Sequence, residues 1–115
     1  MDKSMQKVKE RFVEHFSSRI GPGWQELLVQ FFDEVFDRLT SHGIDSSDVS
    51  FKDFDVKEKR GSICVWTNFM DQVDDIVDRY EQKSNTVCDV CGQAGRLNSG
   101  SNAWLSVRCD EHQIF

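Results

Sequence analysis

The sequence has little of what marks an enzyme, a membrane protein or a secreted protein. Its 115 residues include one proline and one tyrosine, and no apolar run approaches the roughly 20 residues that cross a bilayer. The first residues, Met1 to Lys7, lack the apolar core of a signal peptide. No G-x-S-x-G, phosphate-binding glycine loop or H-E-x-x-H motif occurs. We therefore expect a cytoplasmic protein that is not an enzyme.

Acidic residues outnumber basic ones, yet the chain has enough aromatic residues to build a core. Asp and Glu total 20 against 14 Lys and Arg, which sets the formal net charge at −6. Nine Phe and three Trp exclude a disordered acidic tail, because such tails have few apolar side chains to bury. A chain of this length forms one domain, with room for a small appended module. We divide it into a helical and β-hairpin domain, residues 1–83, and a C-terminal module, residues 84–115.

Two apolar stripes at helical spacing predict the first two helices. A stripe over residues 4–19 recurs every three or four positions, at Met5, Val8, Phe12 and Phe16. A longer stripe begins at Trp24, just after Pro22, which suits a first helical turn because no N–H is needed there. Gly43 ends this stripe, since glycine accepts the left-handed conformation that caps helices. The second helix is the more apolar, so we expect it to be central.

The middle of the chain alternates like a β-hairpin. Residues 49–57 and 62–67 predict two antiparallel strands with a turn that ends at Gly61. The alternation changes phase near Lys52, which predicts a bend there. Cys64 lies in the second strand and is expected to be a small core residue.

A third helical stripe follows and carries many acidic residues. Asn68, with Asp71 three positions later, predicts a capping box at its start. Acidic side chains lie between the apolar positions at Asp71, Asp74, Asp75 and Asp78. This pattern is typical of an ordinary solvated face, and it also suits an anionic surface that contacts a basic partner.

Four residues near the C-terminus have the spacing of two metal-binding knuckles: Cys88, Cys91, Cys109 and His112. The two-residue spacer in each pair lets both side chains turn toward one point, and Gly92 permits a positive φ beside the first pair. Three sulfurs and one nitrogen are a donor set that tetrahedral Zn²⁺ prefers. Because four protein ligands close the coordination shell, we predict a structural Zn²⁺ ion whose binding folds the module. Short strands at residues 96–97 and 104–108 would complete a zinc-ribbon-like hairpin.

Other interpretations of these residues remain open. A redox C-x-x-C pair would leave the second knuckle unused, and a disulfide framework needs an oxidising compartment. A catalytic zinc would require His112 to lie off the metal, so that Asp110 or Glu111 could act as a base. His15 and His42 have no partner at ligand spacing and are expected to be structural or exposed.

The motifs follow one another in an order that is similar to that of known proteins. The series is Gly21-Pro22-Gly23-Trp24, Val56-Lys57-Glu58-Lys59 with Gly61, Cys88-Asp89-Val90-Cys91-Gly92, Gly95-Arg96-Leu97, Trp104 and Cys109-Asp110-Glu111-His112. Over residues 20–112 it resembles a group of short bacterial and phage-borne proteins of unassigned function. In that group a helical half and a Lys-Glu-Lys-Gly hairpin precede a Cys3His module, with an apolar or aromatic residue where this chain has Arg60. The resemblance implies a mobile-element setting and no established activity.

Two functions compete for an α+β protein with about three helices, a β-hairpin and a Cys3His module. The first is a non-enzymatic, zinc-stabilised interaction protein whose acidic surface contacts another protein, and the phage setting suggests inhibition of a host defence or nucleic-acid-handling complex. The alternative is a zinc-ribbon nucleic-acid-binding accessory protein that uses Arg96, Trp104 and Arg108. Charge disfavours the alternative, because residues 84–115 sum to −1 before any thiolate is counted.

Overall fold

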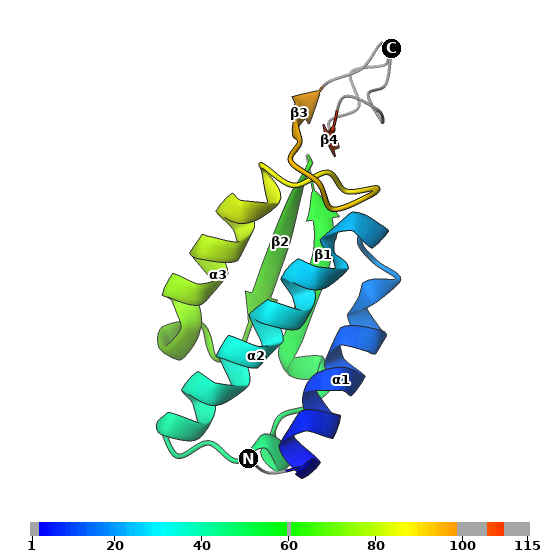
Figure 1. Cartoon of the computed structure of the whole chain (residues 1–115). Coiled ribbons are helices and arrows are strands. Elements are labelled where there is room, and N and C mark those ends of the chain that lie inside the picture. The colour runs from blue at the N-terminus through cyan, green and yellow to red at the C-terminus, as the bar shows by residue number, and fades with distance from the viewer. Residues whose placement is uncertain (1–2, 60, 99–105, 110–115) are drawn as a thin grey trace.

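Three helices and two β-hairpins make up the structure, a computed structural model that describes residues 3–59, 61–98 and 106–109 (Figure 1). The helices are α1 (Lys3–Ser17), α2 (Gln25–Ser41) and α3 (Met70–Ser84). The strands are β1 (Phe54–Lys59), β2 (Ser62–Thr67), β3 (Arg96–Asn98) and β4 (Ser106–Arg108). This confirms the predicted α+β architecture. Within the described ranges, no helix is long and apolar enough to cross a membrane.

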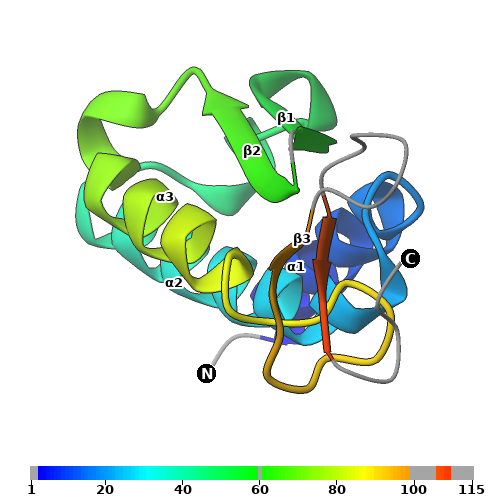
Figure 2. The ribbon, with the colours of Figure 1, turned by 90° about the horizontal axis from the view of Figure 1, so that it is seen from above.

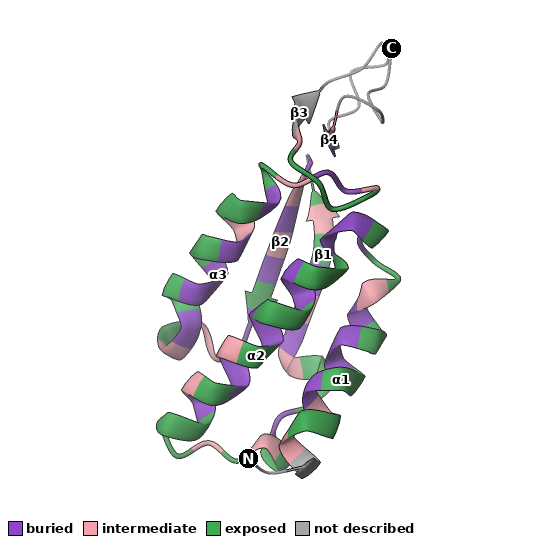
Figure 3. Ribbon diagram, in the orientation of Figure 1, coloured by how far each residue is buried: buried purple, intermediate pink, exposed green. Residues whose placement is uncertain are grey.

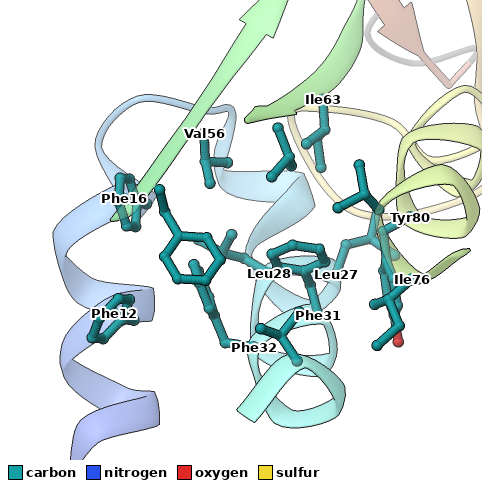
Figure 4. Packing of buried hydrophobic residues seen from close by; sticks show 14 of the residues in the cluster. Phe12, Phe16, Leu27, Leu28, Phe31, Phe32, Val56, Ile63, Ile76 and Tyr80 are labelled. Atoms are coloured by element: carbon teal, nitrogen blue, oxygen red, sulfur yellow. The ribbon is translucent and has the colours of Figure 1, made fainter. Parts of the chain in front are cut away.

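Helix α2 lies between α1 and α3 and packs against both, and the β1–β2 hairpin covers one side of the helices (Figure 2). The apolar side of α2 is buried along the whole length of the helix (Figure 3). Phenylalanine rings such as Phe12 and Phe32 fill the space between α1 and α2 (Figure 4). The ring centroid of Phe12 lies 5.5 Å from that of Phe32 and 5.0 Å from that of Phe36. The predicted central helix is therefore confirmed.

The ends of α2 follow the proline and glycine signals. Pro22–Trp24 form a short 3₁₀ turn that leads directly into the helix. Gly43 follows the helix with a φ of 80°, and the N–H of Ile44 donates a 2.9 Å hydrogen bond back to the carbonyl of Leu39. A side chain at this position would be strained, because residues other than glycine rarely adopt that φ.

The hairpin is confirmed, but its first strand begins later than predicted. Val56 lies opposite Val65 in the antiparallel register, and β1 starts only at Phe54. The stretch before it forms a 3₁₀ turn at Phe51–Asp53, because the Asp53 carboxylate accepts a 2.8 Å hydrogen bond from the backbone N–H of Ser50. This local capping competes successfully with a strand at residues 49–53.

Helix α3 binds the outer edge of β2 through side chains. The Ser84 hydroxyl accepts a 3.0 Å hydrogen bond from the N–H of Ile63, and Glu81 accepts one of 2.9 Å from the N–H of Val65. These contacts satisfy edge donors of β2, which pairs only with β1 among the described strands. Cys64 lies between Ile63 and Val65 and is half-buried on the opposite face, so the prediction that it belongs to the core is wrong.

The predicted capping box of the third helix is also wrong. Phe69 occupies the N-cap position without a side-chain hydrogen bond. Asn68 instead donates a 2.9 Å hydrogen bond to the carboxylate of Asp53, which ties the start of α3 to the turn before β1. The side chain that the sequence assigns to a local cap therefore makes a long-range contact.

One charged side chain is buried between the helices. Lys9 of α1 is 5% exposed, and its Nζ lies 2.7 Å from Asp33 and 3.0 Å from Asp37 of α2. Burial alone would lower the pKa of Lys9, but the two carboxylates outweigh it and raise the pKa above its ordinary value. Lys9 thus stays charged and joins α1 to α2.

Candidate metal centre

Three cysteine thiols converge at the C-terminal end of the structure. The Sγ atoms of Cys88, Cys91 and Cys109 all lie within 4.8 Å of one another, and those of Cys91 and Cys109 are 3.6 Å apart. Tetrahedral coordination at a Zn–S distance of about 2.3 Å separates two ligand sulfurs by about 3.8 Å. No disulfide is assigned to any of the three among the described residues. Their arrangement therefore fits a metal ion better than it fits a covalent pair.

Backbone hydrogen bonds hold the first knuckle in shape. The N–H of Cys88 donates to the carbonyl of Gln93 at 2.7 Å, and the N–H of Gly92 donates to the carbonyl of Cys88 at 3.0 Å. Gly92 has a φ of 83°, as the sequence predicts. The N–H of Asp89 donates to the carbonyl of Val107 at 2.8 Å, which brings β4 and Cys109 beside the knuckle.

The thiols differ in how readily they ionise. Burial raises the pKa of the Cys88 thiol, but nearby backbone N–H groups, above all those of Cys109 and Cys91, outweigh it and lower the pKa to about 6. For Cys91 the backbone N–H of Gln93 lowers the pKa, yet burial and the two neighbouring cysteines raise it more, to above its ordinary value. The Cys88 thiolate therefore forms readily, and negative charge on the neighbouring thiols opposes ionisation of Cys91. A divalent cation would stabilise such a donor set.

Three cysteines supply three of the four predicted ligands. His112 lies outside the residues that the structure describes, as do Asp110 and Glu111, so the fourth ligand stays a prediction. Cys88, Cys91 and Cys109 could hold a metal ion.

The Gly-Pro-Gly-Trp segment packs directly against this knuckle. The N–H of Gly23 donates a 2.8 Å hydrogen bond to the carbonyl of Asp89, and the indole Nε1 of Trp24 donates one of 2.8 Å to the carbonyl of Val87. Trp24 is fully buried. A Cβ on Gly23 would lie 2.1 Å from the Cys88 carbonyl oxygen, and one on Gly21 would lie 2.2 Å from that of Asp89. Both glycines are therefore required by close approach of two backbones.

The sequence predicts a helix break and a first helical turn at this segment, and its contact with the knuckle was missed. Two glycines that flank a proline before a tryptophan do signal close backbone packing. The partner of that packing is more than sixty positions away, in the knuckle. The boundary between residues 1–83 and 84–115 stays a prediction, but Val107 of β4 is fully buried in the same apolar cluster as the helices.

The four aspartates of α3 are all exposed, but they are not equivalent. Asp75 receives two hydrogen bonds from the Arg38 guanidinium, at 2.8 and 3.0 Å, and these lower the pKa of Asp75 to about 2. On the same side Arg79 and Tyr80 both donate to Glu34 of α2, the former at 2.6 Å. Asp75 thus belongs to a contact between α2 and α3.

Three of the other carboxylates of α3 face solvent. Asp71, Asp74 and Asp78 recur at helical spacing along one side, and they form no ion pair with any residue that the structure describes. Asp74 accepts a 2.8 Å hydrogen bond from the N–H of Asp75. These three residues are called the acidic face below.

Two of the three predicted nucleic-acid residues lie in strands of the C-terminal hairpin. Arg96 of β3 and Arg108 of β4 are directly opposite each other in the antiparallel register. Trp104 lies outside the described residues. The two predicted strands exist, and the described part of the second begins at Ser106.

No protein-family model, curated protein or solved structure matches the chain.

Proposed function

We propose that this protein is a small, non-enzymatic interaction protein, stabilised by zinc, whose acidic face binds a basic surface of a partner protein. The observation that carries the proposal is the exposed row of Asp71, Asp74 and Asp78 on a helix that other contacts hold in place. Its phage or mobile-element setting rests on the motif resemblance alone.

The acidic face has the properties of a pre-arranged binding surface. Helix α3 is fixed to α2 through Asp75 and to β2 through Glu81 and Ser84, so its position need not change on binding. Like charges three and four positions apart repel one another, and a cationic partner relieves that repulsion. The net charge of −6 also steers basic partners toward the protein over long range.

The metal centre supplies folding free energy rather than chemistry in this proposal. Cys88, Cys91 and Cys109 would hold Zn²⁺, with His112 as the fourth ligand and no coordination position left for water. Binding free energy at such a site becomes folding free energy for the residues that form it. The described knuckle contacts Gly23 and Trp24, so the helical domain would share in that stabilisation.

The partner that suits this surface is a nucleic-acid-handling complex. Proteins that bind nucleic acid expose Lys and Arg where phosphates are neutralised. Carboxylates at helical spacing can occupy the places of phosphates on such a surface, and a cytoplasmic inhibitor of a host complex would act in this way.

Charge reversal on the acidic face tests the proposal. The probe is a Lys- and Arg-rich peptide, titrated into isotope-labelled protein while backbone amide shifts are recorded. We expect the shifts to centre on α3 and to disappear in the variant D71K/D74K/D78K, which leaves the Asp75 contact with Arg38 intact. If the peptide responded only to the net charge of the protein, the changes in amide chemical shift would be spread over every acidic patch.

A matched control separates the acidic face from overall charge. The variant E10K/E14K/E26K makes the same charge change at exposed positions of α1 and α2. Equal loss of peptide binding in both variants would remove the acidic face as a specific site, and the proposal with it.

A second function has one observation in its favour. The register places Arg96 opposite Arg108, so two basic residues stand at the same position of the β3–β4 pair. A nucleic-acid phosphate carries the opposite charge and would suit such a pair. Replacement of both arginines by glutamine should then weaken RNA or DNA binding and flatten its salt dependence, measured by fluorescence anisotropy.

A further inference from the structure

An aromatic groove lies on the other side of the molecule from the α2–α3 contact, between the end of α1 and the turn before β1. It encloses about 650 Å³ and has Phe16 and Phe54 at its base. His15, Arg19 and Lys52 stand at its rim, together with Phe51. Phe51 is 38% exposed, which is unusual for a phenylalanine that has a hydrophobic core beside it.

His15 and Phe51 form an exposed ring stack. Their centroids are 4.0 Å apart and their planes are within 7° of parallel. Phe12 and Phe16 hold the Phe51 ring edge-on from the core, at 4.7 and 6.3 Å. A planar ring of a ligand can extend such a stack with little loss of freedom in the protein.

Cations surround the stack. Lys7 and Arg11 precede His15 at intervals of four positions on α1, and both are exposed. Arg19 is half exposed and lies 3.2 Å from Asp55 of β1, and Lys57 lies 3.7 Å from the same carboxylate. Two cations therefore share Asp55, and Lys52 adds a third positive charge beside the Asp53 carboxylate, which hydrogen-bonds Ser50 in the groove wall.

Trp66 continues this surface across the hairpin. It lies opposite Asp55 in the β1–β2 register and is 53% exposed, the most exposed of the large apolar side chains among the described residues. Arg19, two positions after the end of α1, lines the groove with His15 and Phe51 and also contacts Asp55, so it lies between the His15–Phe51 stack and Trp66. Two aromatic platforms are thus separated by a cation.

We propose that this surface binds single-stranded nucleic acid. Stacked bases would lie on the His15–Phe51 pair and on Trp66, and the phosphates between them would contact Arg19, Lys52 and Lys57. Duplex DNA hides its bases from such platforms, and an acidic peptide offers charge without planar rings. The surface is separate from the acidic face and from Arg96 and Arg108, so it depends on neither function proposed above.

The test uses the full-length, metal-loaded protein and a fluorescent oligothymidylate of about 12 nucleotides at low salt. We expect salt-sensitive binding in the anisotropy titration, with quenching of tryptophan emission. W66A should weaken binding about fivefold or more and remove most of the quenching, since one stacked base contributes at least about 1 kcal/mol. R19Q/K52Q should weaken binding by a similar factor and reduce its salt dependence.

A matched variant distinguishes binding at this site from a general attraction of the oligonucleotide to positive charge on the protein. K59Q/K83Q removes two exposed positive charges from the opposite end of the hairpin and from α3, and should change the affinity less than about twofold. Absence of binding at low salt would overturn the proposal, as would equal losses in both double variants or equal competition by oligoglutamate. D71K/D74K/D78K should bind the oligonucleotide at least as well as the wild type, so failure of the acidic face and failure of this surface are distinguishable.

Discussion

The indole N–H of Trp24 donates a 2.8 Å hydrogen bond to the backbone carbonyl of Val87, the residue before Cys88. Trp24 is fully buried in the helical core, and the cysteine knuckle continues directly from its hydrogen-bond partner. Order in the knuckle and order at the start of α2 are therefore linked through one side chain. Metal binding and helix packing should respond together.

Metal removal should change the environment of Trp24. In the background W66F/W104F this indole is the only tryptophan, so its emission reports the contact alone. We expect a chelator to shift the emission to longer wavelength and to lower the melting temperature, because the knuckle no longer covers the indole.

Two cysteine variants control this measurement. C88S should reproduce the effect of the chelator without any chelator present, whereas C64S, which lies outside the thiol cluster, should behave like its parent. An emission spectrum that does not change on chelation would show that the contact forms without metal.

Alanine at Gly23 should weaken both the fold and the metal site. Its Cβ would lie 2.1 Å from the carbonyl oxygen of Cys88 and 2.6 Å from the backbone nitrogen of Gly92, so one backbone must move. We expect a loss of about 3 kcal/mol in unfolding free energy. We also expect about tenfold weaker Co²⁺ binding, followed by the thiolate-to-cobalt absorption bands.

Gly43 provides the matched control for that substitution. Its φ is 80°, but a Cβ there would meet no atom within 4 Å. G43A should therefore cost about 1 kcal/mol of stability through backbone strain and leave the Co²⁺ affinity unchanged. If both variants bind Co²⁺ equally well, the packing of Gly23 does not support the knuckle.

The sequence predicts the helices well because their signals are local. Phe12 and Phe16 recur with the helical period, and Gly43 ends α2 where its positive φ is needed. The cysteine cluster is predictable for the same reason, since the two-residue spacer between Cys88 and Cys91 determines their geometry.

The predictions of local structure fail where a polar side chain has more than one possible hydrogen-bond partner. The Asp53 carboxylate bonds both the backbone N–H of Ser50 and the side chain of Asn68, and this one group replaces a predicted strand and a predicted helix cap. Likewise, Asp74 and Asp75 look alike in sequence, and only the position of Arg38 on another helix separates them. Spacing alone carries no such information.

The chain's single tyrosine should titrate far above its ordinary range. Burial, and then the hydrogen bond to the Glu34 carboxylate, raise the pKa of Tyr80 from about 10 to about 12. The folded state therefore holds the phenolic proton more tightly than the unfolded state does. This stabilisation is fully present below pH 10 and is lost as the pH rises through the interval from about 10 to about 12.

Phenolate absorbance measures this titration without interference from a second tyrosine. We expect a midpoint near pH 12 in the native protein, with Y80F as the baseline for other alkaline changes. E34Q should lower the midpoint only part of the way toward 10, because burial of the ring remains when the carboxylate charge is gone. A native midpoint near 10 would mean that solvent reaches the Tyr80 hydroxyl, and that the contact between α2 and α3 through Glu34 is open in solution.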